Sequence, residues 1–217
     1  GSQTTLTFDL ELTTPGFTNE GSNTAVVYNG TFLNGRRMLP SIGYQEGGEL
    51  ERDQDRRKFG LAPKERVRDR DDPVGLQHND LSNDSDWIRF EANLSTEEDQ
   101  IAISPGYLQK EWIEGGRHHY SYKMDVPILN FFAFQSARYA VRRDVWHDKQ
   151  NGRDVQLEVY YQPGHEFNID DMLAASKAAL EYLSTHFGAF QYRQFRILEF
   201  PRYETFAQSF PNTIPYS

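Results

Sequence analysis

The chain contains no cysteine among its 217 residues, so it can form neither a disulfide nor a thiolate metal site. It has no apolar run near the ~20 residues that a membrane-spanning helix needs, and its start lacks the pattern of a signal peptide. Basic residues are in the minority, with 23 Lys and Arg against 32 Asp and Glu, and the net charge is −9. We therefore expect no nucleic-acid partner, because phosphate binding needs clustered Lys and Arg. We also expect no membrane span within this soluble chain, and its composition does not fix a compartment.

Motifs for several chemistries are missing as well. There is no Gly-x-Ser-x-Gly elbow of a serine hydrolase, and no glycine pair leads from a strand into a helix as a phosphate-binding loop does. His118 and His119 are neighbours in a segment of period two, so their side chains should point to opposite faces and cannot chelate one ion. With 32 acidic residues, a carboxylate pair for glycoside hydrolysis can always be found, so that signal has no specificity.

Aromatic residues are abundant, and the 15 Phe and 12 Tyr favour sheets over helices. Residues 5–13 alternate Leu6, Phe8, Leu10 and Leu12 with polar side chains, which predicts a half-buried strand. Asn34-Gly35 predicts a turn, and residues 52–59 predict a short solvated helix in a charged stretch. Further strands are expected within residues 25–32, 88–94, 101–103, 118–126, 131–145 and 155–161.

The pattern changes near residue 165 from a period of two to one of 3.6. Asn168 can cap a helix that ends at Gly188. A buried helix face is expected from Ile169, Leu173, Leu180, Leu183 and Phe187. An apolar strand over residues 195–200 follows and stops at Pro201.

The predicted fold is therefore mostly β. An antiparallel β-sandwich or saddle domain spans residues 1–165, and residues 166–217 hold the first helix and strand of an α/β domain. We expect this second domain to be truncated, because the chain ends soon after the strand without a closing element. An unfinished sheet presents an open edge, so self-association is expected through an apolar face that includes Phe195 and Phe200.

Three segments near the end carry a resemblance: Phe-Gly-Ala-Phe-Gln-Tyr at 187–192, Arg-Ile-Leu-Glu-Phe-Pro-Arg-Tyr at 196–203, and Phe-Ala-Gln-Ser-Phe-Pro-Asn-Thr-Ile-Pro-Tyr-Ser at 206–217. They resemble the start of the catalytic domain in the aminopeptidase N family of zinc metallopeptidases, the gluzincins. The likeness is greatest to a bacterial branch in which the peptidase follows a permease-like membrane segment. Residues 35–40, Gly-Arg-Arg-Met-Leu-Pro, are similar to the family loop Ala-Arg-x-x-Phe-Pro.

The resemblance implies a metallopeptidase whose zinc helix bears His-Glu-x-x-His a few tens of residues further on. His165-Glu166 begins that motif, but Ile169 stands at its fifth position and cannot bind a metal. No cofactor is therefore expected in this chain, whereas zinc is expected in the full-length protein. The expected partners are the rest of the catalytic domain and, in the full-length protein, a peptide substrate; the parent would be a bacterial membrane protein.

The same resemblance gives the candidate substrate-binding residues. When Ile214-Pro-Tyr216 is laid on the family's Ile-x-Tyr, the segment of four residues Ala207, Gln208, Ser209 and Phe210 falls on Ala-Met-Glu-Asn. Ser209 then stands where the family has the Glu that anchors the peptide α-amine, and a hydroxyl offers no charge. A second polar anchor from the β domain would fall at Asn29 or Thr31.

The function predicted is that of a non-catalytic N-terminal portion of a zinc aminopeptidase-like protein, which roofs and partly lines the peptide cleft. An alternative is a non-enzymatic β-sandwich that binds a peptide, a glycan or a partner protein. Its marker would be an exposed aromatic platform with residues such as Tyr107, Trp112 or Trp146. A third hypothesis is a self-contained hydrolase that uses paired acids.

Overall fold

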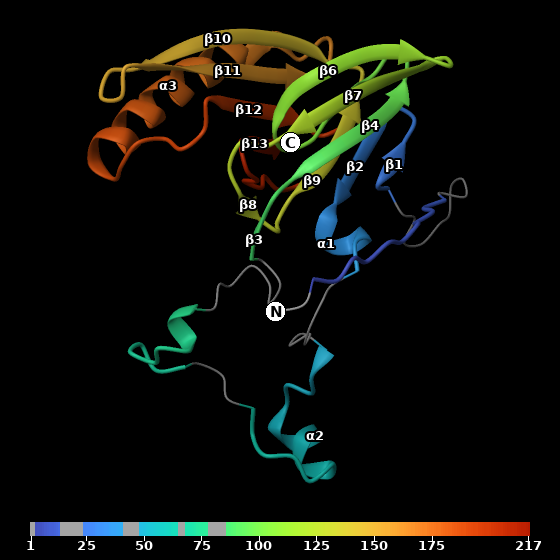
Figure 1. The fold of residues 1–217 in the computed structure, drawn as a ribbon, viewed down its shortest axis with the longest axis vertical. Coiled ribbons are helices and arrows are strands. Elements are labelled where there is room, and N and C mark those ends of the chain that lie inside the picture. Colours follow the sequence, from blue (N-terminus) through green and yellow to red (C-terminus); the bar gives the residue numbers. More distant parts are fainter. Residues whose placement is uncertain (1–2, 14–23, 41–47, 65–67, 78–85) are drawn as a thin grey trace.

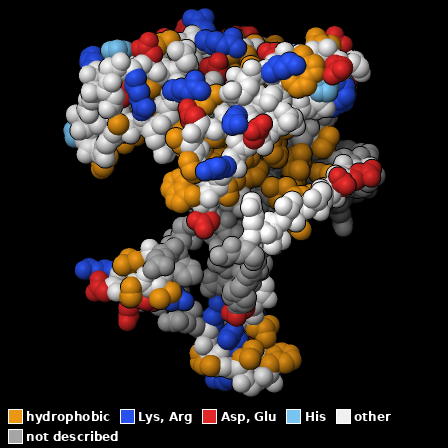
Figure 2. Space-filling view, in the orientation of Figure 1, with side chains coloured by type: hydrophobic (Ala, Val, Ile, Leu, Met, Phe, Trp, Pro, Cys, Tyr) orange, Lys and Arg blue, Asp and Glu red, His pale blue; other side chains and the backbone are white. Residues whose placement is uncertain are grey.

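A computed structural model describes residues 3–13, 24–40, 48–64, 68–77 and 86–217. Within these residues the strands form four sheets, and the sheets lie together in the upper body of Figure 1. Residues 48–64 and 68–77, with α2 (Asp53–Lys58) and η2 (Gly75–Gln77), extend away from this body in the same view. Figure 2 shows basic and acidic side chains on this part of the molecule. No helix in the described part of the chain is both long and apolar enough to cross a membrane.

One four-stranded sheet has the order β1-β2-β9-β5 and is antiparallel throughout. Its strands are β1 (Val26–Val27), β2 (Gly30–Asn34), β9 (Ala133–Ala137) and β5 (Ile101–Ile103). At Gly30 the backbone of β2 comes so close to β9 that an added Cβ would lie 1.8 Å from the Ser136 carbonyl oxygen. Only glycine fits at this position.

A three-stranded antiparallel sheet, β4-β7-β6, lies beside it. Its strands are β4 (Glu91–Glu97), β7 (Arg117–Lys123) and β6 (Tyr107–Glu114). The rings of Tyr120 and Tyr122 are buried and pack with Ala102 of β5, which joins the two sheets. A two-stranded ladder of β3 (Trp87–Ile88) and β8 (Ile128–Leu129) completes this part of the chain.

The fourth sheet is mixed and has the order β10-β11-β12-β13. Strands β10 (Ala140–Asp148) and β11 (Arg153–Tyr161) are antiparallel, whereas β12 (Gln194–Glu199) and β13 (Thr213–Tyr216) run parallel to β11. Helix α3 (Ile169–His186) connects β11 to β12 and packs on the sheet. The core between α3 and this sheet contains these buried residues: Trp146, Val155, Leu157, Val159, Ile169, Leu173 and Leu180.

The remaining helices are short. They are α1 (Gly35–Met38), α2 (Asp53–Lys58), and the 3-10 turns η2 (Gly75–Gln77) and η3 (Glu166–Asn168). Helix α2 agrees with the solvated helix predicted over residues 52–59, and it buries no side chain. Asn34-Gly35 starts α1 instead of forming the predicted turn, because the Asn34 side chain accepts a hydrogen bond from the Arg36 amide at 3.0 Å.

The mostly β, largely antiparallel fold predicted from the sequence is confirmed, and so are the main helix and the strand that follows it. Two details of α3 differ. Asn168 makes no side-chain capping bond, and Leu183 and Phe187 are exposed. The buried stripe runs through Leu180 to Ser184. Leu183 lies one position off this stripe and so faces solvent.

The strand predicted over residues 5–13 is wrong. The structure assigns no regular element to residues 3–13, and Leu6, Phe8, Leu10 and Leu12 are all exposed. Alternation produces a strand only where a neighbouring strand accepts its backbone hydrogen bonds, and none pairs with this segment.

Two features concern the expected division at residue 165. The mixed sheet contains strands from both sides of that position, since β11 pairs with β12; the division itself stays a prediction. Phe200 is only 2% exposed and contacts Phe32 and Phe206, so it does not belong to the exposed apolar face that was expected. Phe195 is partly buried against the helix-covered core.

Candidate functional site

Asn29 links the antiparallel part of the chain to the mixed sheet. It lies in the turn between β1 and β2, and its Nδ2 donates to Gln162 Oε1 and to the Pro201 carbonyl, both at 3.0 Å. Gln162 follows β11 and Pro201 comes two residues after β12. Asn29 therefore contacts the carboxyl ends of two parallel strands, which is where open α/β sheets usually bind ligands.

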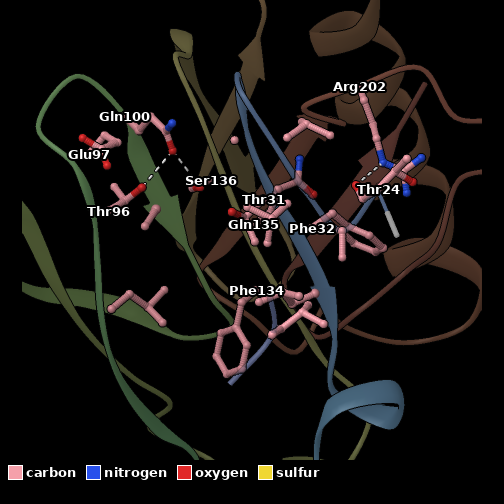
Figure 3. Close-up of a pocket in the computed structure, with 18 of the residues that line it drawn as sticks. Thr24, Thr31, Phe32, Thr96, Glu97, Gln100, Phe134, Gln135, Ser136 and Arg202 are labelled. Carbon is pink, nitrogen blue, oxygen red and sulfur yellow. Dashed lines mark hydrogen bonds between the residues drawn. The ribbon is translucent and has the colours of Figure 1, made fainter. Parts of the chain in front are cut away.

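Thr31 lies on β2 and lines a cavity of about 1510 Å³. The next residue, Phe32, packs edge-on against Phe200 with ring centroids 4.8 Å apart and contacts Phe206 at 6.3 Å. Phe206 lines the same cavity. Thr31 of the β part (Figure 3) and Phe206, the start of the C-terminal candidate segment, therefore border one space.

The segment 206–216 folds back on itself. The Gln208 amide donates to the Pro215 carbonyl at 3.2 Å, and Phe210 and Thr213 exchange two backbone bonds of 2.8 and 3.1 Å. Asn212 makes the turn with a positive φ of 48°, which asparagine tolerates better than most residues. Ala207 and Ser209 are exposed on this hairpin, and Gln208 is half-buried.

Phe210 behaves differently from its neighbours because its ring is buried against Phe131, with centroids 4.7 Å apart. Ala207, Gln208, Ser209 and Phe210 do not line the cavity that Thr31 borders, and neither does Asn29. Contacts of Pro201 with Asn29 and of Phe206 with Phe32 bring the candidate pair Asn29 and Thr31 near the candidate segment 207–210. The six candidate side chains do not, however, line one common cavity.

The cavity has a polar wall that the sequence pattern did not reveal. Gln100 Oε1 accepts hydrogen bonds from the hydroxyls of Thr96 at 2.8 Å and Ser136 at 2.9 Å, and all three side chains are buried (Figure 3). On the opposite side Arg202 Nε donates to the Thr24 carbonyl at 2.6 Å. Thr96 and Ser136 lie on strands β4 and β9, whereas Gln100 lies in the turn between β4 and β5, so strand periodicity gives no signal for it.

A second polar cluster surrounds Glu199 at the carboxyl end of β12. His165 Nδ1 lies 2.5 Å from Glu199 Oε1, and the Gln162 amide donates to Oε2 at 2.7 Å. Tyr216 is the register partner of Glu199 on β13. Burial, followed by the charge of Glu199, raises the pKa of Tyr216 to about 12. His165 lies in the loop between β11 and η3, and Glu199 was not singled out from the sequence.

The described residues were expected to hold no zinc ligand set, and that expectation stays a prediction. No group of three or more His, Asp or Glu that could hold a metal occurs among the described residues. Ile169, the fifth residue of the motif that His165 begins, is the first residue of α3 and is 5% exposed in its core. The expectation that zinc belongs to the full-length protein stays a prediction.

The aromatic platform proposed for a binding module is not formed by the residues named for it. Tyr107 and Trp146 are each 6% exposed. The Trp112 ring stacks on His119 at 5.0 Å and lies 4.6 Å from the Lys110 ammonium, so its surface is already in contact. His118 and His119 do point to opposite faces of β7, since His118 contacts Tyr120 while His119 contacts Trp112.

Neither a protein-family model nor a curated protein sequence matches this chain. Solved structures do share its fold. Aminopeptidase A of Legionella pneumophila, in complex with aspartic acid, superposes with a TM-score of 0.56 at 19% identity, over 61% of this chain and 16% of the other.

The M1 zinc metallopeptidase of Deinococcus radiodurans is also similar. A variant bound to the peptide Tyr-Ser-Ala gives a TM-score of 0.54 at 14% identity, and another structure of the same enzyme gives 0.53 at 15%. The matches cover 61% and 62% of this chain and 31% of the Deinococcus chains, so this chain spans well under two thirds of either enzyme. This chain therefore shares its mostly β fold with part of each of these two enzymes.

Proposed function

We propose that this chain is the N-terminal portion of a zinc aminopeptidase-like protein, in which the antiparallel sheets roof a peptide cleft and the segment 206–216 lines it. The observation that supports this most is the junction between the two parts of the fold. Asn29 bonds to Gln162 and Pro201, and Phe32 packs on Phe200 and Phe206. The β part thereby meets the mixed sheet at the carboxyl ends of its parallel strands.

Ser209 sets the expected substrate preference. Its side chain is exposed on the hairpin and offers a hydroxyl where the resemblance places an amine-anchoring Glu. A carboxylate pairs with an ammonium as an opposite charge as well as a hydrogen-bond acceptor, whereas a hydroxyl supplies the acceptor alone. We therefore propose a parent enzyme that binds peptides with little preference for a free α-amine at this position.

The zinc ion, with its helix, belongs to the remainder of the full-length protein in this proposal. The chain itself supplies the roof and one wall of the cleft and takes no part in water activation. The permease-like segment of a bacterial parent membrane protein is part of the same proposal, and residues 166–217 would be the beginning of its catalytic domain.

The test compares this chain with a longer one that continues through the next His-Glu-x-x-His of the gene. Aminoacyl fluorogenic substrates and amino-terminally acetylated peptides are supplied with added zinc. We expect chelator-sensitive turnover by the longer protein only, with similar rates on free and acetylated peptides. A Ser209→Glu variant of the longer protein should shift the preference toward free amines.

Two outcomes would overturn the proposal. Turnover by residues 1–217 that a chelator abolishes would place the metal in this chain, and His165→Ala would show whether His165 holds it. A longer protein that folds and contains no zinc-binding motif would remove the basis for a peptidase.

A further inference from the structure

A line of polar groups runs from the surface of the three-stranded sheet to its interior. The Glu111 carboxylate of β6 lies 2.7 Å from His118 Nε2 on β7. His118 Nδ1 lies 2.8 Å from the Tyr120 hydroxyl, and that hydroxyl lies 3.1 Å from the Gln100 carbonyl oxygen. The Glu111 side chain is 48% exposed, the His118 side chain 16%, and Tyr120 only 2%.

Counting protons shows what this line requires. The Glu111 carboxylate and the Gln100 carbonyl can only accept hydrogen bonds, so the three contacts between them need three protons. A tyrosine hydroxyl supplies one and a neutral imidazole supplies one more. All three bonds form together only when both ring nitrogens of His118 carry a proton.

We propose that His118 is a proton-dependent clamp that holds the β6–β7 hairpin to the wall of the cavity when its ring is doubly protonated. In the neutral ring one of the three contacts has no proton. The Tyr120 hydroxyl then turns either toward His118 Nδ1 or toward the Gln100 carbonyl, and the other bond is lost. A buried acceptor without a partner is unfavourable, so the clamp loosens.

The inner end of the line is the polar wall described above. The Gln100 amide donates to the Glu97 carbonyl at 3.0 Å, which closes the turn between β4 and β5. Its side chain holds Thr96 and Ser136, and all three residues line the cavity (Figure 3). A change at His118 therefore reaches the cavity through two hydrogen bonds, from His118 to Tyr120 and from Tyr120 to Gln100.

Two buried tyrosines of β7 lie near the His118 ring and keep their hydroxyl protons. Burial, and then the charge of Glu111, raises the pKa of Tyr120 above its ordinary value, so its hydroxyl keeps its proton. Tyr122 stacks on Tyr120 at 6.3 Å and donates to the Ala102 carbonyl at 2.9 Å.

The other charged side chains nearby have partners of their own. Asp99, beside Gln100, pairs with Arg138 at 2.6 Å. Arg117 pairs with Glu97 at 4.0 Å. Arg117 is the residue before His118 on β7, so its side chain lies on the other face of the sheet, with that of His119. Among the described residues, Glu111 is the carboxylate in contact with the His118 ring.

The direct test is a nitrogen-detected NMR titration of the histidine rings in the whole chain, with the His118 signals identified by their loss in His118→Gln. The matched control is His147, whose Nδ1 lies 2.8 Å from the Asp154 carboxylate but whose side chain is 61% exposed and has no ring contact with a tyrosine among the described residues. We expect both ring nitrogens of His118 to give the signals of protonated nitrogens wherever the folded chain keeps the bond from Tyr120 to Gln100. A neutral His118 ring in a folded chain that keeps this bond would overturn the proposal.

The second test is thermal stability as a function of pH. Because the clamp depends on the second ring proton, the stability that it adds should fade as rising pH removes that proton. The melting temperature of the wild-type chain minus that of Tyr120→Phe should therefore fall as the pH rises, and His147→Gln should leave this difference unchanged. A difference that stays constant with pH would overturn the clamp, and the NMR result on the wild type decides the matter even if Tyr120→Phe does not fold.

Discussion

The antiparallel sheets and the mixed sheet of this chain are held together by different chemistry. Between β5 and the β6–β7 hairpin, buried tyrosines pack their rings and send their hydroxyls to backbone carbonyls, Tyr120 to Gln100 and Tyr122 to Ala102. Beneath α3, in contrast, the core is largely aliphatic, and Val155, Leu157 and Val159 are at most 1% exposed. The stability of the mixed sheet should therefore depend most on the volume of its aliphatic side chains, and that of the antiparallel sheets on the hydrogen bonds of their buried tyrosines.

The buried faces of the two parts have different partners. In the mixed sheet, β11 turns Val155, Leu157 and Val159 into the core beneath α3, whereas Asp154 and Gln156 on its other face are exposed. The three-stranded sheet keeps one face in solvent, and β7 alternates buried Tyr120 and Tyr122 with more exposed residues. Substitutions in one part can therefore test its contacts separately from those of the other part.

The largest effect is expected in the aliphatic core. Leu173→Ala removes a side chain that is 5% exposed between α3 and the sheet, and it should lower the free energy of unfolding by about 2–5 kcal/mol. Urea denaturation measures the change. The matched control is Leu183→Ala on the same helix, where the side chain is 51% exposed and the change should stay within about 0.5 kcal/mol. Equal losses at both positions would contradict the packing described for α3.

A somewhat smaller effect is expected where β2 approaches β9. Gly30→Ala places a methyl group 1.8 Å from the Ser136 carbonyl, so the two strands must separate, at a cost of about 1–3 kcal/mol. Gly48→Ala is the control, because nothing lies within 4 Å of its added Cβ. Amide hydrogen exchange should show faster opening of β2 and β9 in the first variant, while the aliphatic core keeps its protection.

The junction between the two parts is weaker still. Asn29→Ala removes the hydrogen bonds to Gln162 and Pro201, each worth about 0.5–1.5 kcal/mol. Asn93→Ala, at an exposed position of β4, should be nearly neutral. If limited proteolysis of Asn29→Ala left the junction as resistant as in the wild type, Asn29 would not be what joins the β part to the mixed sheet.

The smallest effect at neutral pH concerns the tyrosines. Burial raises the pKa of Tyr122 to about 12, against about 10 in an unfolded chain. The neutral hydroxyl is therefore favoured by folding, and its contribution is complete below about pH 10 and lost as the pH rises toward 12. Ultraviolet absorbance of tyrosinate, followed together with circular dichroism, should show Tyr122 ionising only as the chain unfolds. In Tyr122→Phe, alkaline unfolding should begin at a higher pH.

Much of the local structure could be predicted from the sequence because the signal is local. The alternation in β4, β7 and β11 and the 3.6 period of α3 each place apolar residues on one face. The predictions were wrong where burial or strand pairing depends on a segment distant in the sequence. Residues 5–13 alternate like a strand but find no pairing partner, and Leu183 fits the helical spacing but lies beside the buried stripe.

The candidate site was less accessible from the sequence. Asn29 was singled out, but its partners Gln162 and Pro201 were not recognised as such, since they lie 133 and 172 residues further along the chain. The Gln100 wall and the Glu111–His118–Tyr120 line join residues at most 36 positions apart, and they were also missed. A pairing of polar groups depends on which strands become neighbours, and single-sequence periodicity carries no information on that.

The order of residues alone determined that this chain would be rich in strands, that one long helix would follow residue 168, and that cysteine chemistry would play no part. Tertiary structure decided which apolar faces are buried and which polar side chains meet. The physical reason is that periodicity arises from backbone geometry within a few residues, whereas burial and hydrogen-bond partners depend on segments that approach only when the sheets assemble.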